Sequence, residues 1–159
     1  MKTPAELFNL MPTDAIIVNA GLWYNPTFVQ DQAEGYIKDM REMLEYIDTH
    51  TETLPVIIWR ETSAQHFKNG AGGLFPPGTP ATDRVCGARP PAQYIDARND
   101  LVRGAVEAAG LAVLRVWEST TLMANATMWD QNTPDCTHYC QPGVPDVWAD
   151  LVFNQLLHI

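Results

Sequence analysis

The fold is decided by one short apolar stretch, Leu54-Pro55-Val56-Ile57-Ile58-Trp59-Arg60. An uninterrupted apolar run of this length is typical of a strand that lies in a parallel sheet and is buried on both faces. Pro55 stands at the start of the run, where a strand tolerates a proline. We therefore expect a central strand that ends at Arg60.

Two similar runs stand on either side of this stretch, at residues 14–19 and 111–117, and both predict further buried strands. Between the runs, apolar residues recur at helical spacing over 27–50 and 92–109. A short helix from Thr3 and a last helix from about Pro145 are also expected, the last packing through Trp148, Leu151, Val152, Leu156 and Ile159. This alternation predicts a single α/β domain over residues 1–159, with a short parallel sheet flanked by helices.

The carboxyl ends of the strands are where such sheets bind ligands. Asn19 and Arg60 follow two of these ends, so we expect both at one rim of the sheet. The connection over 61–91 is rich in glycine and proline, and loops of this length are usually binding loops, lids or disordered inserts. Residues 118–129 are expected to be partly helical.

Composition narrows the class of partner. The chain has 159 residues, a net charge of −9 and a pI of about 4.7. This acidity argues against nucleic acid and against an anionic membrane surface, since both need clustered Lys and Arg. No apolar run approaches the roughly 20 residues of a membrane span, and the first residues do not resemble a signal peptide, so we expect a soluble chain. Asn125-Ala126-Thr127 is a glycosylation sequon, usable only in the secretory pathway.

Asp135 and His138 are the strongest candidates for chemistry. Their i, i+3 spacing brings two side chains together in a helical or turn-like backbone. A carboxylate beside an imidazole fixes the tautomer and stabilises the imidazolium, as a general base in a Ser-His-Asp system requires. The alternative is a surface loop that happens to contain a histidine.

The cysteines leave several possibilities open. Three are present, Cys86, Cys136 and Cys140, which allow one disulfide and one free thiol. In an extended backbone Cys136 and Cys140 lie too far apart to pair, whereas a turn brings them within range, and Cys86 is the other possible partner. If the backbone is extended, Cys136, His138 and Cys140 face one side. Together with Asp135 they are then a rival candidate for a zinc site.

The wider string resembles a known family. Residues 135–148 read Asp-Cys-Thr-His-Tyr-Cys-Gln-Pro-Gly-Val-Pro-Asp-Val-Trp. This is similar to the C-terminal block of the PC-esterase group of SGNH hydrolase-like proteins, to which the trichome birefringence-like polysaccharide O-acetyltransferases belong. Residues 59–67, Trp-Arg-Glu-Thr-Ser-Ala-Gln-His-Phe, resemble a second block of that family, and residues 14–23 resemble a third. The resemblance implies the C-terminal two-thirds of an SGNH domain, a flavodoxin-like three-layer fold.

The resemblance also implies roles for individual residues. His138 is the expected base and Asp135 the group that orients it. Asn19 and Gly21 are expected to support an oxyanion, which an amide and a neighbouring backbone N–H can do. Arg60 and His66 are expected to bind the substrate, although a loop histidine is more often structural.

The implied chemistry is hydrolysis or transfer of acyl groups, with acetyl esters of carbohydrates as substrates and without a metal or organic cofactor. Neither serine, Ser63 or Ser119, lies in a Gly-Asp-Ser context, so we expect the nucleophile in a block upstream of this chain. The alternative is a truncated or non-catalytic SGNH-like binding domain. The family's plant members are Golgi membrane proteins, so the secretory pathway is one candidate compartment; the sequence does not predict an oligomeric state.

Overall fold

A computed structural model of the chain describes residues 10–11, 13–24, 30–68, 75–88, 97–130 and 133–158. The helix expected from Thr3 lies outside these residues, as does Ile159. Within them, no helix is long and apolar enough to cross a membrane.

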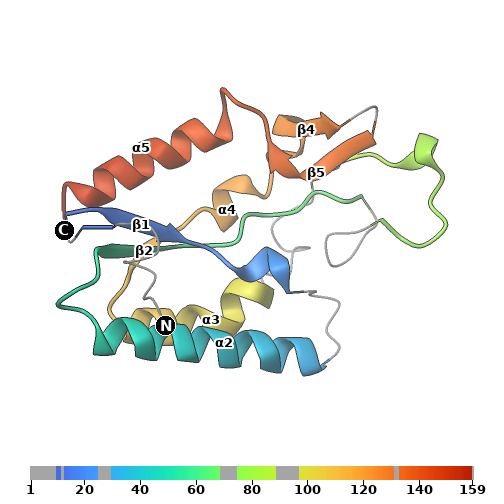
Figure 1. The fold of residues 1–159 in the computed structure, drawn as a ribbon. Helices are drawn as coiled ribbons and strands as arrows, with labels where there is room; N and C mark the ends of the chain where they lie inside the picture. Colours follow the sequence, from blue (N-terminus) through green and yellow to red (C-terminus); the bar gives the residue numbers. More distant parts are fainter. Residues whose placement is uncertain are drawn as a thin grey trace.

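The described chain is built on a three-stranded parallel sheet. Its strands are β1 (Ala15–Val18), β2 (Val56–Arg60) and β3 (Ala112–Leu114), in the order β1-β2-β3. Helices α2 (Gln30–Thr49) and α3 (Ala97–Ala108) cover one face, and α5 (Val144–Leu156) lies over the other (Figure 1). This confirms an α/β fold with a short parallel sheet between helices.

Each face of the sheet has its own apolar cluster. Trp59 packs on the α2–α3 side with the buried side chains of Tyr36, Met40, Leu44, Val102 and Val106. Ile58 points to the other side and packs with Leu114 and Val116, against which Trp148 and Val152 of α5 lie. Alternate residues of β2 thus fill both clusters, which is why its sequence is apolar without interruption.

The strand at residues 14–19 was expected to be buried on both faces, and this prediction is wrong. β1 is the edge strand, its residues alternate between exposed and half-buried, and Ile17 is 47% exposed. α5 packs on the β3 side of the sheet and leaves the β1 side open.

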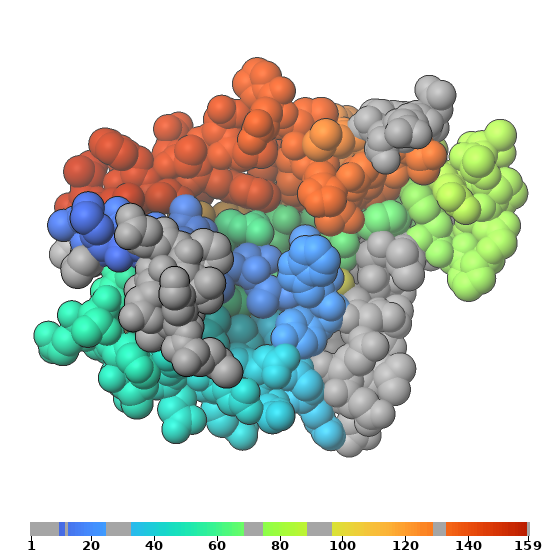
Figure 2. All heavy atoms as spheres, in the orientation of Figure 1, coloured from blue at the N-terminus to red at the C-terminus, as the bar shows by residue number. Residues whose placement is uncertain are grey.

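Only part of the expected packing of α5 is observed. Trp148 and Val152 pack on the sheet, but Leu151 is 37% and Leu156 40% exposed, and none of the helix's residues is fully buried. Together with Phe153 and Leu157, at 64% and 65%, they leave an apolar flank along the helix. In Figure 2 this helix (red) and the first strand (blue) lie next to each other on the visible face.

Residues 118–129 are partly helical, as expected, and a β-hairpin that the sequence does not predict follows. Strand β4 (Thr127–Asp130) pairs antiparallel with β5 (Thr133–Tyr139), beyond the carboxyl ends of the parallel strands (Figure 1). Helical structure before the hairpin is limited to α4 (Trp117–Thr120) and a 3-10 turn, η4 (Ala124–Ala126). Two more 3-10 turns, η1 (Gly21–Trp23) and η2 (Ala81–Asp83), lie in the connections.

Glu61 explains why β3 stops earlier than the expected 117. Glu61 is 6% exposed, and its Oε2 accepts hydrogen bonds from the N–H groups of Val116 and Trp117, both at 3.1 Å. These are N-terminal amides of α4, where a carboxylate is favourable. The residue after β2 therefore ends β3 and starts the next helix.

A disulfide fixes the long connection to the hairpin. Cys86 and Cys136 are bonded, with Cα atoms 5.2 Å apart, while Cys140 is free. The backbone N–H of His66 donates to Cys136 O, and that of Gly87 donates to His66 O, both at 2.8 Å. This settles the cysteine pairing, and it removes the zinc alternative because Cys136 is not a free thiolate.

The disulfide closes a loop with a sequence separation of 50. Cys86→Ser should therefore lower the free energy of unfolding by about 2–4 kcal/mol, chiefly by releasing the unfolded chain. Urea denaturation followed by circular dichroism measures this. Cys140→Ser is the matched control and should leave the midpoint unchanged. A Cys86→Ser midpoint equal to that of the control would contradict the pairing.

Candidate active site

Asp135 and His138 touch because β5 is irregular. In a regular strand, residues three apart point to opposite faces. Here Thr127 pairs with Tyr139 while its neighbour Met128 pairs with Asp135, so residues 136–138 bulge out of the ladder. The bulge turns the two side chains toward each other, and His138 Nδ1 lies 2.6 Å from Asp135 Oδ2. The contact expected from the spacing is present.

The same carboxylate also organises the bulge. Asp135 Oδ1 accepts hydrogen bonds from the backbone N–H groups of Thr137 at 3.0 Å and His138 at 3.1 Å. Burial by itself would raise the pKa of Asp135. The hydrogen bonds from the His138 side chain and from the two backbone amides outweigh it and hold this pKa below its ordinary value.

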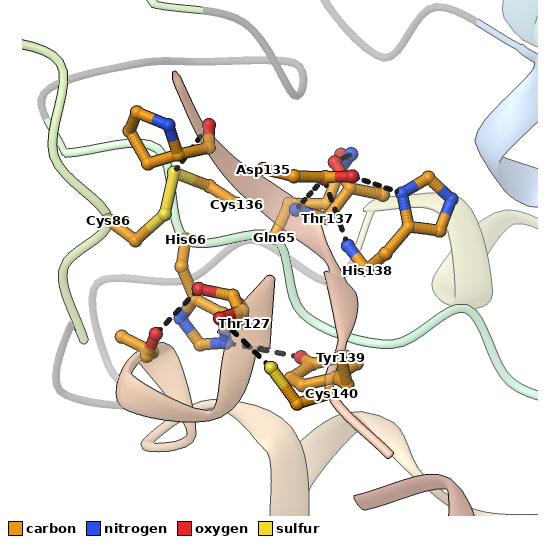
Figure 3. Close-up of a disulfide and its surroundings, with 12 residues drawn as sticks. Gln65, His66, Cys86, Thr127, Asp135, Cys136, Thr137, His138, Tyr139 and Cys140 are labelled. Atoms are coloured by element: carbon orange, nitrogen blue, oxygen red, sulfur yellow. Dashed lines mark hydrogen bonds and ion pairs between the residues drawn. A yellow bond between two sulfur atoms is a disulfide. The ribbon is translucent and has the colours of Figure 1, made fainter. Parts of the chain in front are cut away.

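This arrangement defines the imidazole. Ionised Asp135 accepts a hydrogen bond from the Nδ1–H group of His138, so the basic lone pair of the neutral ring is at Nε2. The His138 side chain is 68% exposed, whereas that of Asp135 is 26% exposed. Figure 3 shows the pair on one side of β5 and the disulfide on the other. The geometry therefore suits a base that is held at one nitrogen and accessible at the other.

The pair lies on the wall of an open pocket of about 800 Å³. The wall is formed by the end of β2, η1, the hairpin and the start of α5. Its residues are Leu22, Arg60, Ser63, Met128, Asp135, Thr137, His138, Tyr139, Gln141, Pro145 and Trp148. The structure thus brings Arg60 together with Asp135 and His138, as the position of Arg60 at the rim of the sheet predicts.

Three aromatic and cationic groups form one side of this pocket. The Tyr139 and Trp148 rings meet edge to face, with centroids 5.6 Å apart. The Arg60 guanidinium carbon lies 4.8 Å from the centre of the Trp148 ring, a cation–π distance. Trp148 is presented by α5, which begins after Gly143; there the backbone N–H donates to the carboxylate of Asp146.

Asn19 and Gly21 lie beside the pocket and do not line it. The Asn19 amide nitrogen donates to Arg60 O at 2.9 Å and to Thr62 Oγ1 at 3.1 Å, so it ties the end of β1 to the end of β2. Gly21 is buried, and a Cβ there would collide with Thr62 Oγ1. A glycine is therefore needed at this position for close packing, next to Leu22 in the pocket wall.

His66 lies behind the wall and is fully buried at 0% exposure. The Tyr139 hydroxyl donates to Ala64 O at 2.7 Å, so it accepts from His66 Nε2 at 3.1 Å. In this structure His66 supports Tyr139 and does not reach the pocket, where the sequence predicts a substrate contact.

Several residues of the site do not stand out in the sequence. Tyr139 lies between two cysteines and Trp148 reads as a core residue of a helix, yet both line the pocket. Asn99 is buried on α3 and exchanges two hydrogen bonds with the Thr62 backbone, at 2.8 and 3.0 Å. In the sequence, the sign of this role is that a polar residue, Asn99, shares the buried face of α3 with Val102 and Val106.

The two serines occupy different positions. Ser63 lines the pocket but is only 5% exposed. Ser119 lies on α4, outside the pocket, and its hydroxyl donates to Val116 O at 3.1 Å. Neither follows the sharp strand-to-helix turn that exposes a nucleophilic serine.

Comparison with known proteins finds a match for the part of the chain that contains Asp135 and His138. Residues 111–155, which include β5 and most of α5, match the PC-esterase family, a GDSL/SGNH-like acyl-esterase family found in Pmr5 and Cas1p. Over these residues the chain is similar to the PC-esterases. The expected resemblance to the C-terminal part of that family is thus confirmed.

Individual plant proteins are also similar to this chain. The chain is 21% identical to protein trichome birefringence-like 12 of Arabidopsis thaliana, over 91% of this chain and 44% of that protein. It is 58% identical to xylan O-acetyltransferase 12 of Oryza sativa subsp. japonica, over 24 residues that make up 15% of this chain and 5% of the relative. The chain therefore spans less than half the length of these curated relatives. No solved structure matches it.

The lowered pKa of Asp135 makes stability depend on pH. A depressed carboxyl pKa stabilises the fold fully above its ordinary value of 3.8, and this stabilisation is lost as the pH falls through the folded value. The urea midpoint should therefore fall less between pH 5 and pH 2.5 in Asp135→Asn than in the parent chain. Asp48→Asn, an exposed change on α2, is the control. Parallel pH curves for parent and Asp135→Asn would contradict the assignment.

The buried hydroxyl of Tyr139 gives a second test. Tyr139→Phe leaves the ring in place but removes the partner of Ala64 O and His66 Nε2. Leaving buried polar groups unpaired should lower the free energy of unfolding by about 1–3 kcal/mol. Urea denaturation measures the loss, with the half-exposed Tyr46→Phe as control. Equal stability of the two variants would show that the Tyr139 hydroxyl does not support the pocket wall.

Proposed function

We propose that this chain supplies the acid–base half of an SGNH-type acyl-esterase or O-acetyltransferase site that acts on acetyl esters of carbohydrates. The observation that carries the proposal is the Asp135–His138 pair, 2.6 Å apart, on the wall of an 800 Å³ pocket. The match of residues 111–155 to an acyl-esterase family supports the reaction class. The names of the rice relatives support acetyl groups on a polysaccharide as the substrate.

The proposed reaction has two stages. A serine hydroxyl attacks the acyl carbonyl while His138 Nε2 accepts its proton, and Asp135 stabilises the imidazolium through Nδ1. The imidazolium then protonates the departing sugar alkoxide, which leaves an acyl-enzyme. In the second stage His138 deprotonates water or a new sugar hydroxyl, which attacks the acyl carbon; the bond to the serine oxygen breaks, and the imidazolium returns the proton to that oxygen. The acceptor alone separates hydrolysis from transfer.

The nucleophilic serine is proposed to come from polypeptide that precedes this chain in a longer protein. Neither serine of the chain has the expected turn, and the alignments cover less than half of each relative. Among the described residues β1 is an edge strand, which supports this placement because an edge can pair with a further strand. A preceding parallel strand paired with β1 would end at the same rim of the sheet as the pocket.

Asn19 and Gly21 remain the proposed oxyanion donors. The Asn19 amide is now bonded to Arg60 O and Thr62 Oγ1, so an oxyanion would have to replace the Thr62 acceptor. Arg60 is proposed to contact the substrate directly. His66 is proposed to act one step behind it, by holding Tyr139.

A fluorophosphonate probe tests this division of the site, because it labels only an activated nucleophile. The 159-residue chain alone should remain unlabelled in mass spectrometry. A protein extended upstream by a Gly-Asp-Ser block should be labelled at that serine. It should also hydrolyse p-nitrophenyl acetate, with a turnover that His138→Ala lowers by roughly 10⁴-fold.

Exposed His158 of the last turn provides the control, since His158→Ala should leave both readouts unchanged. An adduct at Ser63 of the short chain that disappears in His138→Ala would refute the upstream nucleophile. An extended protein with neither adduct nor turnover would favour the alternative, a non-catalytic binding domain.

A further inference from the structure

The triplet Asn125-Ala126-Thr127 is a motif of the chain that the proposed function does not use. It has the form of an acceptor for N-linked oligosaccharides, and it is the only complete triplet of this kind in the sequence. Asn25-Pro26-Thr27 has the same outer residues, but a proline in the middle position excludes it as an acceptor. The chain therefore contains one acceptor triplet and one natural negative control.

The fold presents the asparagine of this triplet to solvent. Asn125 lies in η4, the 3-10 turn before strand β4, and it is exposed. Ala124, the residue before it, is 5% exposed, and Thr127 is 6% exposed. The turn buries these two neighbours and leaves the Asn125 side chain outside, so a bulky group on its amide can be accommodated without disturbing the core.

Three large apolar side chains close to Asn125 in the sequence are also exposed. Leu122 is 64% exposed, and Met123 and Met128 are each 43% exposed. Grouped apolar side chains on a protein surface commonly mark a place that another group covers. An oligosaccharide on Asn125 is bulky and hydrophilic, so it would shield this part of the surface from water and from other chains.

The disulfide is an independent observation that points to a compartment. Cys86 and Cys136 are bonded. Such bonds form and persist in oxidising compartments such as the lumen of the endoplasmic reticulum, and they are rare where thiols are kept reduced. An acceptor triplet is used in the same lumen. The disulfide and the triplet therefore agree on a route through the secretory pathway.

We propose that Asn125 is an N-glycosylation site, and that its donor is an oligosaccharide linked to a lipid diphosphate. In the transfer, Asn125 Nδ2 attacks the first sugar carbon of the donor. The bond from Nδ2 to this carbon forms, the bond from the carbon to the diphosphate oxygen breaks, and Nδ2 loses one proton. The lipid diphosphate leaves, and no oxidant or reductant is needed. This inference does not rest on the proposed acyl-transfer function.

The transfer has to take place before the hairpin closes. The triplet requires a hydroxyl at its third position, but in the folded chain Thr127 Oγ1 donates to Ala124 O at 2.7 Å inside the turn. The end of β5 holds the triplet from the other side, since the backbone N–H of Cys140 donates to Ala126 O at 2.8 Å and its thiol donates to Thr127 O at 3.5 Å (Figure 3). Modification therefore occurs on the unfolded segment, and the exposed position of Asn125 lets the folded chain keep the oligosaccharide.

The test is expression of the 159-residue chain in cultured mammalian cells behind a cleavable secretion signal. Its intact mass is measured before and after peptide N-glycosidase F, which turns a glycosylated asparagine into aspartate, and peptide mapping then locates the aspartate. The parent chain should lose the mass of an oligosaccharide and carry aspartate at position 125. Asn125→Gln and Thr127→Ala should lose no mass, whereas Thr127→Ser should still do so because it keeps the hydroxyl. Asn154→Gln, a change of an exposed asparagine of α5 outside any acceptor triplet, is the matched control and should behave like the parent.

Cleavage of the signal shows that a chain has entered the compartment, so secreted and retained material are equally informative. A signal-cleaved parent chain with an unmodified Asn125 would overturn the proposal, as would a loss of mass that persists in Asn125→Gln. Cys86→Ser lacks the disulfide that holds the hairpin, so it should be modified at least as fully as the parent. Lower modification of Cys86→Ser would contradict transfer before folding. None of these readouts needs a nucleophile, so every result leaves the acyl-transfer proposal standing.

Discussion

The site depends on one long-range attachment, the contact between the segment after β2 and strand β5. It consists of the His66–Cys136 backbone hydrogen bond, the Gln65–Thr137 side-chain bond at 2.9 Å, the Tyr139–Ala64 bond and the Cys86–Cys136 disulfide. Without it the sheet and the hairpin share few contacts. With it, the end of the central strand and the Asp135–His138 pair face one pocket.

The bulge in β5 is the second constraint. In a regular two-stranded ladder only one of the backbone amides of residues 137 and 138 would face the partner strand, and Asp135 and His138 would point to opposite faces. The Asp135 carboxylate satisfies those amides instead. One side chain therefore both stabilises the irregular backbone and orients the imidazole, so the geometry of the pair is built into the local fold.

The two faces of the sheet are covered unequally. The α2–α3 face encloses large buried side chains. On the opposite face, among the described residues of α5, Trp148 and Val152 pack against the cluster near β3. This asymmetry accounts for the exposed Ile17 and for the apolar flank of α5. It also explains why Trp148 can serve two purposes, as a core residue of the sheet and as a pocket wall beside Arg60.

The sequence by itself determined the parallel strands and the long helices, because both are encoded by local periodicity. The Asp135–His138 contact was predicted from a helical or turn-like spacing, but it depends on the bulge in β5. Tertiary structure alone decided that Cys86 pairs with Cys136, that β1 is an edge, and that His66 lies behind Tyr139. Cysteine pairing and strand order depend on distances between segments far apart in the chain, which local patterns do not carry. The hairpin was not predicted because β5 contains Pro134 and several polar residues, so it lacks the apolar pattern of a strand. Its position is fixed by its contact with the segment after β2.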